Sequence, residues 1–193
     1  MAHPEPLVND RGLLLARHGE TDDNRQPLRV QGFRDPPLNE TGRRQAAELA
    51  ERIAARGDVR SLWSSDLSRA RETAQIVGRH TGLGEPWLDA RLREANRGIW
   101  EGRLFIEIER EDPAGYAAWL RAGADFRFPG GESLQEQSDR VTAALDEIEA
   151  AGELPALVVC HGCSVRVMLC RAEPRGLDAF HKYEIPNVAV VEL

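Results

Sequence analysis

Two histidines, each followed by a glycine, are the residues of this sequence best suited to chemistry. His18 follows an apolar run at residues 13–16, with Arg17 between them, and His161 follows a second apolar run at residues 156–160. Imidazole is a good nucleophile near neutral pH, and the planar guanidinium group suits phosphate oxygens. The two His-Gly pairs therefore predict a phosphate site in which a histidine attacks phosphorus.

Strand-like and helix-like segments alternate along the chain and must position these residues. Strands are expected at residues 13–17, 59–63, 156–160 and 188–192. Continuous apolar strands that alternate with helices predict an α/β fold, a three-layer sandwich with a largely parallel central sheet flanked by helices. Ligands of such sheets bind beyond the carboxyl ends of the strands, where both His-Gly pairs stand.

Polar residues that cap helices mark where the helices begin. Asn39, Ser68 and Ser133 are expected to cap helices that run to about residues 56, 81 and 151, and a further helix is expected at residues 164–171. Gly57 and Gly82 are expected to end the first two of these helices.

Residues 97–131 fit this alternation poorly and are rich in aromatic side chains. The rings belong to Trp100, Phe105, Tyr116, Trp119, Phe126 and Phe128. We predict a helical insertion that covers the site as a lid. Alternatively, the rings are ordinary core residues, and for most of them this alternative is favoured.

Composition bounds the class of protein. The 193 residues suit one domain, which we place at residues 12–193 after a disordered leader at residues 1–11. The net charge is −7, and no long cluster of basic residues is present, which argues against a nucleic-acid partner. No apolar run approaches the roughly 18 residues that a membrane span needs, so we expect no membrane partner.

The three cysteines favour a cytoplasmic location. An odd number of cysteines without a signal peptide is typical of a reducing compartment rather than of a disulfide framework. Cys160, His161 and Cys163 have the spacing of half a zinc site, but no second cluster supplies the remaining ligands. We therefore favour small buried side chains over a metal site.

Four sequence motifs lie near the predicted site. They are RHGET at residues 17–21, SSDLSRARET at residues 64–73, LRE at residues 92–94 with GIWEG at residues 98–102, and HG at residues 161–162 with GGES at residues 130–133. Together they resemble the histidine phosphatase superfamily, which contains the cofactor-dependent phosphoglycerate mutases and many small phosphatases. The resemblance runs from about Leu13 to Asn187 and implies a phosphoglycerate mutase-like fold.

The resemblance also implies roles for five catalytic residues. His18 is expected to be the nucleophile that becomes phosphohistidine. Arg17, Arg69 and His161 are expected to form a cationic cradle around the phosphate. Glu94 is expected to give a proton to the leaving oxygen and later to activate water, although a solvated carboxylate is the alternative.

Four further polar residues are candidates for binding the substrate. Asn24 is similar in position to a family residue that contacts the phosphate, and a turn residue is the alternative for it. Thr21, Gln31 and Ser64 are weaker candidates near the site.

Physical chemistry supports this division of roles. A phosphoryl group in transfer spreads negative charge over its oxygens, so fixed donors around it supply most of the catalysis. The nucleophilic ring needs an acceptor for its second nitrogen, and a backbone carbonyl suits that task. A carboxyl group beside an anionic phosphate has its pKa raised and can act as an acid. The chemistry requires no metal and no cofactor.

The expected function is hydrolysis of a small organic phosphate monoester, by a phosphoric monoester hydrolase of the histidine acid phosphatase type. A phosphoglycerate mutase is one alternative, but the short insertion and the lack of a C-terminal tail favour the small phosphatase branch. A protein phosphatase and a non-catalytic phosphate-binding scaffold are further alternatives. The expected partner is a small phosphorylated metabolite, whose identity the sequence leaves open, and a homodimer also stays open.

Overall fold

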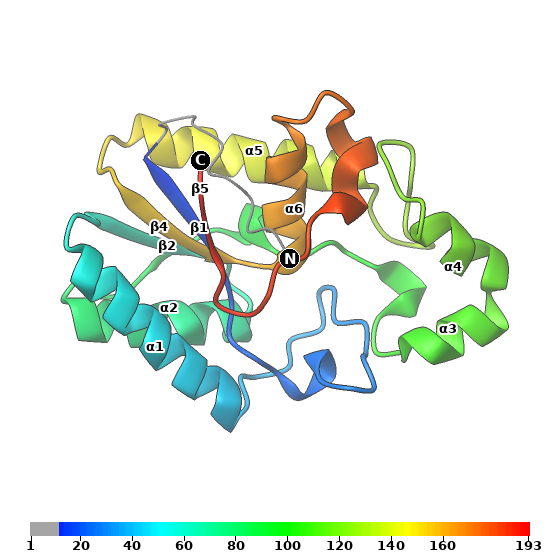
Figure 1. Cartoon of the computed structure of the whole chain (residues 1–193), viewed down its shortest axis with the longest axis horizontal. Helices are drawn as coiled ribbons and strands as arrows, with labels where there is room; N and C mark the ends of the chain where they lie inside the picture. The colour runs from blue at the N-terminus through cyan, green and yellow to red at the C-terminus, as the bar shows by residue number, and fades with distance from the viewer. Residues whose placement is uncertain (1–11) are drawn as a thin grey trace.

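A five-stranded sheet organises the molecule (Figure 1), and the computed structural model describes residues 12–193. The strands are β1 (Leu13–Arg17), β2 (Ser61–Ser64), β3 (Trp87–Leu88), β4 (Ala156–Cys160) and β5 (Val190–Glu192), in the order β3-β2-β4-β1-β5. The first four strands run parallel and β5 runs antiparallel to β1. The largely parallel sheet expected from the sequence is confirmed.

Helices cover both faces of the sheet. Helices α1 (Glu40–Arg56) and α2 (Ser68–Thr81) lie on one face, and α5 (Leu134–Ala150) and α6 (Gly162–Cys170) lie on the other (Figure 1). Alternate residues of β1 enter the two cores: Leu13 and Leu15 face α5 and α6, whereas Leu14 and Ala16 face α1 and α2. Both faces of β1 and β4 are therefore dry, which explains their unbroken apolar sequences.

The ends of three helices follow local sequence signals. The Asn39 side chain accepts a hydrogen bond from the backbone N–H of Gly42, and Ser133 forms a capping box at the start of α5. Gly57 and Gly82 end α1 and α2 in the left-handed conformation. These capping predictions are confirmed.

The Ser68 prediction is wrong. Ser68 is the first helical residue and Leu67 holds the cap position, because the Ser68 hydroxyl and N–H both donate to Asp35. A tertiary contact thus replaces the local cap.

Several element boundaries also differ from those expected. The strand expected at residues 59–63 is Ser61–Ser64, and the helix expected at residues 164–171 begins directly after His161, at Gly162. The two-residue β3 was not predicted. Four short 3-10 helices were not predicted either: Asp22–Asn24, Ala90–Leu92, Gly98–Trp100 and Gly176–Lys182.

The aromatic insertion is helical and packs as core. It contains α3 (Phe105–Glu111) and α4 (Pro113–Trp119), which lie at one end of the molecule (Figure 1). Trp100, Trp119 and Phe128 are buried, and the ring centroids of Trp119 and Phe128 lie 5.1 Å apart. The core alternative is confirmed for these three rings, while the role of a lid stays a prediction, as does the assignment of a single domain. The leader predicted at residues 1–11 lies outside the described residues.

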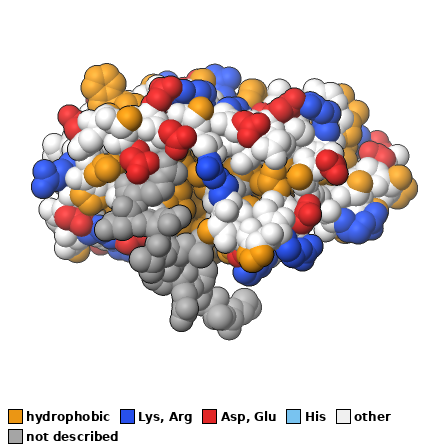
Figure 2. All heavy atoms as spheres, turned by 90° about the horizontal axis from the view of Figure 1, so that it is seen from above, with side chains coloured by type: hydrophobic (Ala, Val, Ile, Leu, Met, Phe, Trp, Pro, Cys, Tyr) orange, Lys and Arg blue, Asp and Glu red, His pale blue; other side chains and the backbone are white. Residues whose placement is uncertain are grey.

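One face of the molecule is mixed in charge. On the face shown in Figure 2, acidic and basic side chains are interspersed rather than gathered by sign. Across the described residues 12–193, no helix has the length and apolar character needed to cross a membrane.

A contact between two glycines fixes the loop that carries His18. A side chain on Gly19 would place its Cβ 2.4 Å from the carbonyl oxygen of Gly42, and one on Gly42 would place its Cβ 2.1 Å from the carbonyl oxygen of Glu20. Neither position has room for a Cβ atom. The first turn of α1 therefore lies directly against the loop that follows β1.

Replacing Gly42 with alanine tests this contact. Glycine to alanine within a helix ordinarily stabilises by about 0.8–1.0 kcal/mol. Here we expect Gly42→Ala to lower the free energy of unfolding by about 1–3 kcal/mol in urea denaturation, because the added methyl overpacks the contact. Glu48→Ala, at an exposed position of the same helix, is the control and should change stability by no more than about 0.5 kcal/mol. A Gly42→Ala protein more stable than the wild type would contradict the close approach.

Candidate active site

The two histidines meet at the carboxyl edge of the sheet. Arg17 at the end of β1 pairs in register with Cys160 at the end of β4, so the next residue of each strand is a histidine. The ring centroids of His18 and His161 lie 5.1 Å apart, and the two residues are 2% and 0% exposed. The meeting of two imidazoles predicted from the sequence is confirmed.

A backbone hydrogen bond selects the tautomer of His18. Its Nδ1 lies 2.6 Å from the carbonyl oxygen of Gly19. A carbonyl oxygen only accepts hydrogen bonds, so Nδ1 carries the proton and Nε2 keeps its lone pair. Burial, with Arg69 and Arg17 nearby, holds the pKa of His18 well below its ordinary value. The ring is therefore neutral at pH 7, as a nucleophile requires.

Arg69 lies directly against the nucleophilic nitrogen. Its Nε donates to His18 Nε2 at 3.3 Å, and its two terminal nitrogens donate to the carbonyl oxygens of Arg34 and Gly32 at 2.8 and 3.0 Å. Burial lowers the pKa of Arg69 to about 10, so the side chain stays a cation at neutral pH. Three of its five N–H groups are used, which leaves two for an oxyanion.

Arg17 and His161 each have a buried nitrogen with no hydrogen-bond partner. Arg17 Nη1 donates to the carbonyl oxygen of Ile185 at 2.6 Å, but its Nε is unpaired. His161 Nε2 lies 2.9 Å from the hydroxyl of Ser65, but its Nδ1 is unpaired. Buried polar atoms are normally paired, and Arg17 lines the cavity in front of His18, so its Nε is available to a ligand there. A tetrahedral oxyanion supplies the acceptors that the Arg17 nitrogen lacks.

A small cavity of about 90 Å³ lies in front of His18. It is lined by Arg17, His18, Asp23, Asn24, Leu28, Arg29, Val30, Gln31, Gly32, Glu94 and Arg97. Cationic and polar side chains, among them Arg17, Arg97 and Asn24, therefore surround a small space next to the His18 ring.

The polar candidates after His18 form one network. Gln31 donates to the Thr21 hydroxyl at 2.9 Å, and that hydroxyl donates to Asn24 Oδ1 at 3.0 Å. Asn24 donates in turn to Asn187, which donates to the backbone carbonyl of His18 at 2.9 Å. Asn24 and Gln31 line the cavity, whereas Thr21 is fully buried and supports them.

Ser64 lies elsewhere. Its hydroxyl is buried and donates to the backbone carbonyl of Ser65 at 2.8 Å. The neighbouring Ser65 instead contacts His161. The structure therefore does not bring Ser64 to the cavity with the other candidates.

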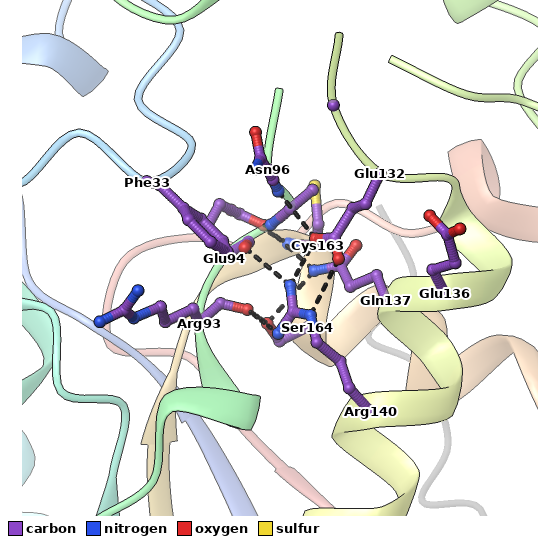
Figure 3. Close-up of polar contacts among 12 residues, drawn as sticks. Phe33, Arg93, Glu94, Asn96, Glu132, Glu136, Gln137, Arg140, Cys163 and Ser164 are labelled. Carbon is purple, nitrogen blue, oxygen red and sulfur yellow. Dashed lines mark hydrogen bonds and ion pairs between the residues drawn. The ribbon is translucent and has the colours of Figure 1, made fainter. Parts of the chain in front are cut away.

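Glu94 reaches the cavity from the loop that follows β3. Its carboxylate accepts hydrogen bonds from the N–H of Ala95 at 2.9 Å, from the N–H of Cys163 at 3.4 Å and from Gln137 at 3.4 Å (Figure 3). Burial alone raises the pKa of Glu94, but Arg97, the Ala95 amide and Arg69 together lower it below the ordinary value. Glu94 is thus ionised near neutral pH. The raised pKa expected beside an anionic phosphate, where a second negative charge is present, stays a prediction.

Sequence reasoning missed Arg97 as part of the site. Its side chain is nearly buried, donates to Cys163 Sγ at 3.0 Å and lies 5.1 Å above the rings of both Trp119 and Phe128. It also lines the cavity beside Glu94. In the sequence, Arg97 is only an arginine three residues after Glu94. Its place in the site depends on contacts that form when the insertion folds. Ser65, Gln137 and Asn187 were missed for the same reason.

The cysteines are buried and neutral. Cys160, Cys163 and Cys170 are free thiols, and burial raises the pKa of the first to about 12 and of the other two to about 11. Within residues 12–193, no group of three or more His, Cys, Asp and Glu side chains is placed to hold a metal ion. The expectation of small buried side chains is confirmed for all three cysteines.

Comparisons with known proteins agree with this geometry. The family described as the histidine phosphatase superfamily (branch 1) matches residues 13–193. Phosphoglycerate mutase-like protein 4 of Arabidopsis thaliana is 39% identical over 165 residues, which cover 84% of this chain and 71% of that protein.

Solved structures of two phosphatases share the fold. Mycobacterial glucosyl-3-phosphoglycerate phosphatase in complex with VO3 superposes with a TM-score of 0.83 at 30% identity, covering 92% of this chain and 88% of that one. A phosphoserine phosphatase mutant of Entamoeba histolytica in complex with phosphoserine superposes with a TM-score of 0.77 at 28% identity, covering 92% and 87%.

Nitrogen-15 NMR of the histidine rings tests the tautomer of His18. At pH 7 we expect a protonated Nδ1 and an unprotonated Nε2, with the signal assigned by its loss in His18→Ala. The titration midpoint should lie below the ordinary value of 6.5, because burial and two arginines oppose a second proton on the ring. A midpoint at or above 6.5, or a proton on Nε2, would contradict the account.

Proposed function

The chain belongs to the histidine phosphatase superfamily, and from this premise we propose that it is a metal-independent phosphatase that hydrolyses small organic phosphate monoesters through a phosphohistidine. One observation carries the proposal: the Nδ1 of His18 is committed to the carbonyl of Gly19, which leaves a neutral Nε2 facing Arg69. That nitrogen has the lone pair, the orientation and the cationic neighbour that attack on phosphorus needs.

The first step transfers the phosphoryl group to the enzyme. Arg17, Arg69 and His161 hold the phosphate oxygens while His18 Nε2 attacks phosphorus in line with the leaving oxygen. The N–P bond forms as the P–O bond to the leaving group breaks. Glu94 gives its proton to the leaving oxygen, so the free alcohol departs.

Glu94 must first acquire that proton, because its lowered pKa leaves it ionised near neutral pH. A phosphate monoester has a second pKa of about 6 and therefore carries a proton in part of its population near neutral pH. Binding of the monoanion beside Glu94 delivers one proton to the pair. The negative charge of the bound phosphate then raises the pKa of Glu94 and keeps the proton on it.

The second step releases phosphate. A water molecule takes the place of the departed alcohol and attacks phosphorus, while the Glu94 carboxylate accepts its proton. The N–P bond breaks, Glu94 passes the proton to the departing inorganic phosphate, and His18 returns to the neutral Nδ1–H form. The same carboxylate thus acts as acid and then as base.

A phosphoglycerate mutase is the second candidate. The name of the Arabidopsis relative favours it, whereas the two phosphatases of known structure favour hydrolysis. A mutase must return the phosphoryl group to an organic acceptor rather than to water. A non-catalytic scaffold has less support, because His18 and Glu94 line the same cavity.

Phosphate release from a panel of phosphate monoesters tests the main proposal. We expect turnover that persists in EDTA and is abolished in His18→Ala, because no other described group replaces the Nε2 lone pair. His80→Ala, which changes an exposed histidine of α2, is the control and should match the wild type.

The same proteins are assayed in parallel for phosphoglycerate isomerisation with a bisphosphate primer. Isomerisation without phosphate release would replace hydrolysis by the mutase activity. Turnover by His18→Ala at the wild-type rate would refute the nucleophile assignment.

Leaving groups of different acidity test the role of Glu94. We expect Glu94→Gln to lower kcat/KM for an alkyl phosphate by about 10²–10⁴-fold, because the alkoxide then leaves without a proton. The loss with nitrophenyl phosphate should be much smaller, since nitrophenolate leaves unprotonated. An equal loss with both substrates would make Glu94 a structural residue.

A further inference from the structure

The backbone that carries Glu94 lacks the hydrogen bonds of regular structure. Residues 93–97 lie between two short 3-10 helices and belong to no helix or strand. Buried carbonyl groups of such a segment need donors from elsewhere in the fold. The position of the Glu94 carboxylate therefore depends on whatever supplies these donors.

One arginine on α5 supplies donors to two of these carbonyl groups, and to a third carbonyl just before the segment. Arg140 Nη1 donates to the carbonyl oxygens of Arg91 and Arg93 at 2.6 and 2.7 Å, and its Nη2 donates to the carbonyl oxygen of Glu94 itself at 2.8 Å. Figure 3 shows the guanidinium group reaching from α5 toward this loop. A single planar group thus fixes three carbonyls within four consecutive residues, a task that suits the rigid fork of arginine.

Glu132 locks this arginine in place. Its two carboxylate oxygens accept from Arg140 Nε at 3.0 Å and from Nη2 at 2.5 Å. The oxygen that accepts from Nη2, Oε1, also accepts from the backbone N–H of Asn96 at 2.7 Å, on the far side of Glu94. The Arg140 and Glu132 side chains are only 19% and 14% exposed, so solvent competes weakly with these bonds.

Two further side chains hold the Glu94 loop and its carboxylate. Ser164 on α6 donates to the carbonyl of Arg93 at 3.1 Å, and Gln137, one turn before Arg140 on α5, donates to the Glu94 carboxylate at 3.4 Å. The loop and the carboxylate are thus held from the same two helices.

The same arginine also connects the Glu94 loop to the phosphate side of the cavity. The guanidinium groups of Arg93 and Arg140 lie 5.3 and 5.8 Å from the centre of the Phe33 ring. Phe33 stands between Gly32 and Arg34, whose carbonyls hold Arg69. The contact with Phe33 therefore connects the loop that carries Glu94 to the loop at residues 32–34, which positions Arg69.

We propose that Arg140, locked by Glu132, is a positioning residue that sets the distance between the Glu94 carboxyl group and the leaving oxygen of the substrate. It touches neither substrate nor reacting atoms and acts through three backbone carbonyls. The proposal rests on the proposed role of Glu94 as general acid. A displacement of about 1 Å of an acid from its working position costs on the order of 100-fold in rate, so the effect of losing Arg140 is measurable.

The test compares kcat/KM for an alkyl phosphate and for nitrophenyl phosphate in Arg140→Met. The value of kcat/KM depends on the steps up to and including departure of the leaving group. It does not depend on the later release of phosphate. We expect a loss of about 10–100-fold with the alkyl ester and little loss with the nitrophenyl ester, because only the first needs a well-placed proton. A substitution that disturbed the cradle of Arg17, Arg69 and His161 would instead lower kcat/KM for both esters.

Arg127→Met is the matched control. Arg127 also donates to a backbone carbonyl, that of Gly131, and pairs with Glu136, but it contacts no part of the Glu94 loop. The ratio of the two kcat/KM values should stay at that of the wild type in this variant. Glu132→Gln serves as the second variant where Arg140→Met folds poorly, since it keeps the size of the side chain and weakens the lock.

The double variant Glu94→Gln, Arg140→Met separates the two claims. If Arg140 acts through Glu94, the double variant loses no more of the alkyl-ester rate than Glu94→Gln alone. A further loss in the double variant, or an equal loss with both esters in Arg140→Met and in Glu132→Gln, would overturn the positioning role. Absence of leaving-group selectivity in Glu94→Gln itself would instead refute the proposed acid.

Discussion

The hydrogen bond from His18 Nδ1 to the carbonyl of Gly19 is the interaction on which the site depends. It leaves Nε2 unprotonated, with a lone pair that accepts from Arg69 Nε, on a ring that lines the cavity. The bond requires that the chain turn sharply after β1, and the turn is held by the first helical turn of α1 against Gly19 and by Asn187 on the His18 carbonyl. The sheet, the contact between Gly19 and Gly42, and the C-terminal segment therefore together hold His18 in the tautomer that is protonated at Nδ1.

Burial of positive charge is the second constraint. The protein carries a net charge of −7, yet Arg17 and Arg97 line a cavity of about 90 Å³, and Arg69 lies against the His18 ring that also lines it. Desolvation lowers the pKa of Arg69 only to about 10, so the cation persists, while the pKa values of both histidines fall and the rings stay neutral. The result is a site with fixed cations, a neutral nucleophile and buried nitrogens that a bound oxyanion completes.

The sequence predicted features that depend on neighbouring residues and missed features that depend on contacts between residues distant in sequence. Strands such as Leu13–Arg17 and caps such as Asn39 depend on neighbouring residues, and both were predicted. Ser68 was predicted to cap a helix, but its hydroxyl donates a hydrogen bond to Asp35, which is distant in sequence. Arg97 and Arg140 acquire their roles from aromatic rings and carbonyls that only the folded chain brings together, so no local pattern identified them. Assignment of His18 and Glu94 to chemistry relied on the motifs around them.

Direct identification of the phosphorylated atom tests the central claim. The protein is mixed with substrate in EDTA, quenched within milliseconds in alkali, which preserves phosphohistidine, and digested for mass spectrometry and phosphorus NMR. The account predicts phosphate on His18, bonded to Nε2, because Nδ1 is held by the Gly19 carbonyl. Phosphate on Nδ1, on another residue, or no phosphoenzyme during steady turnover would contradict it.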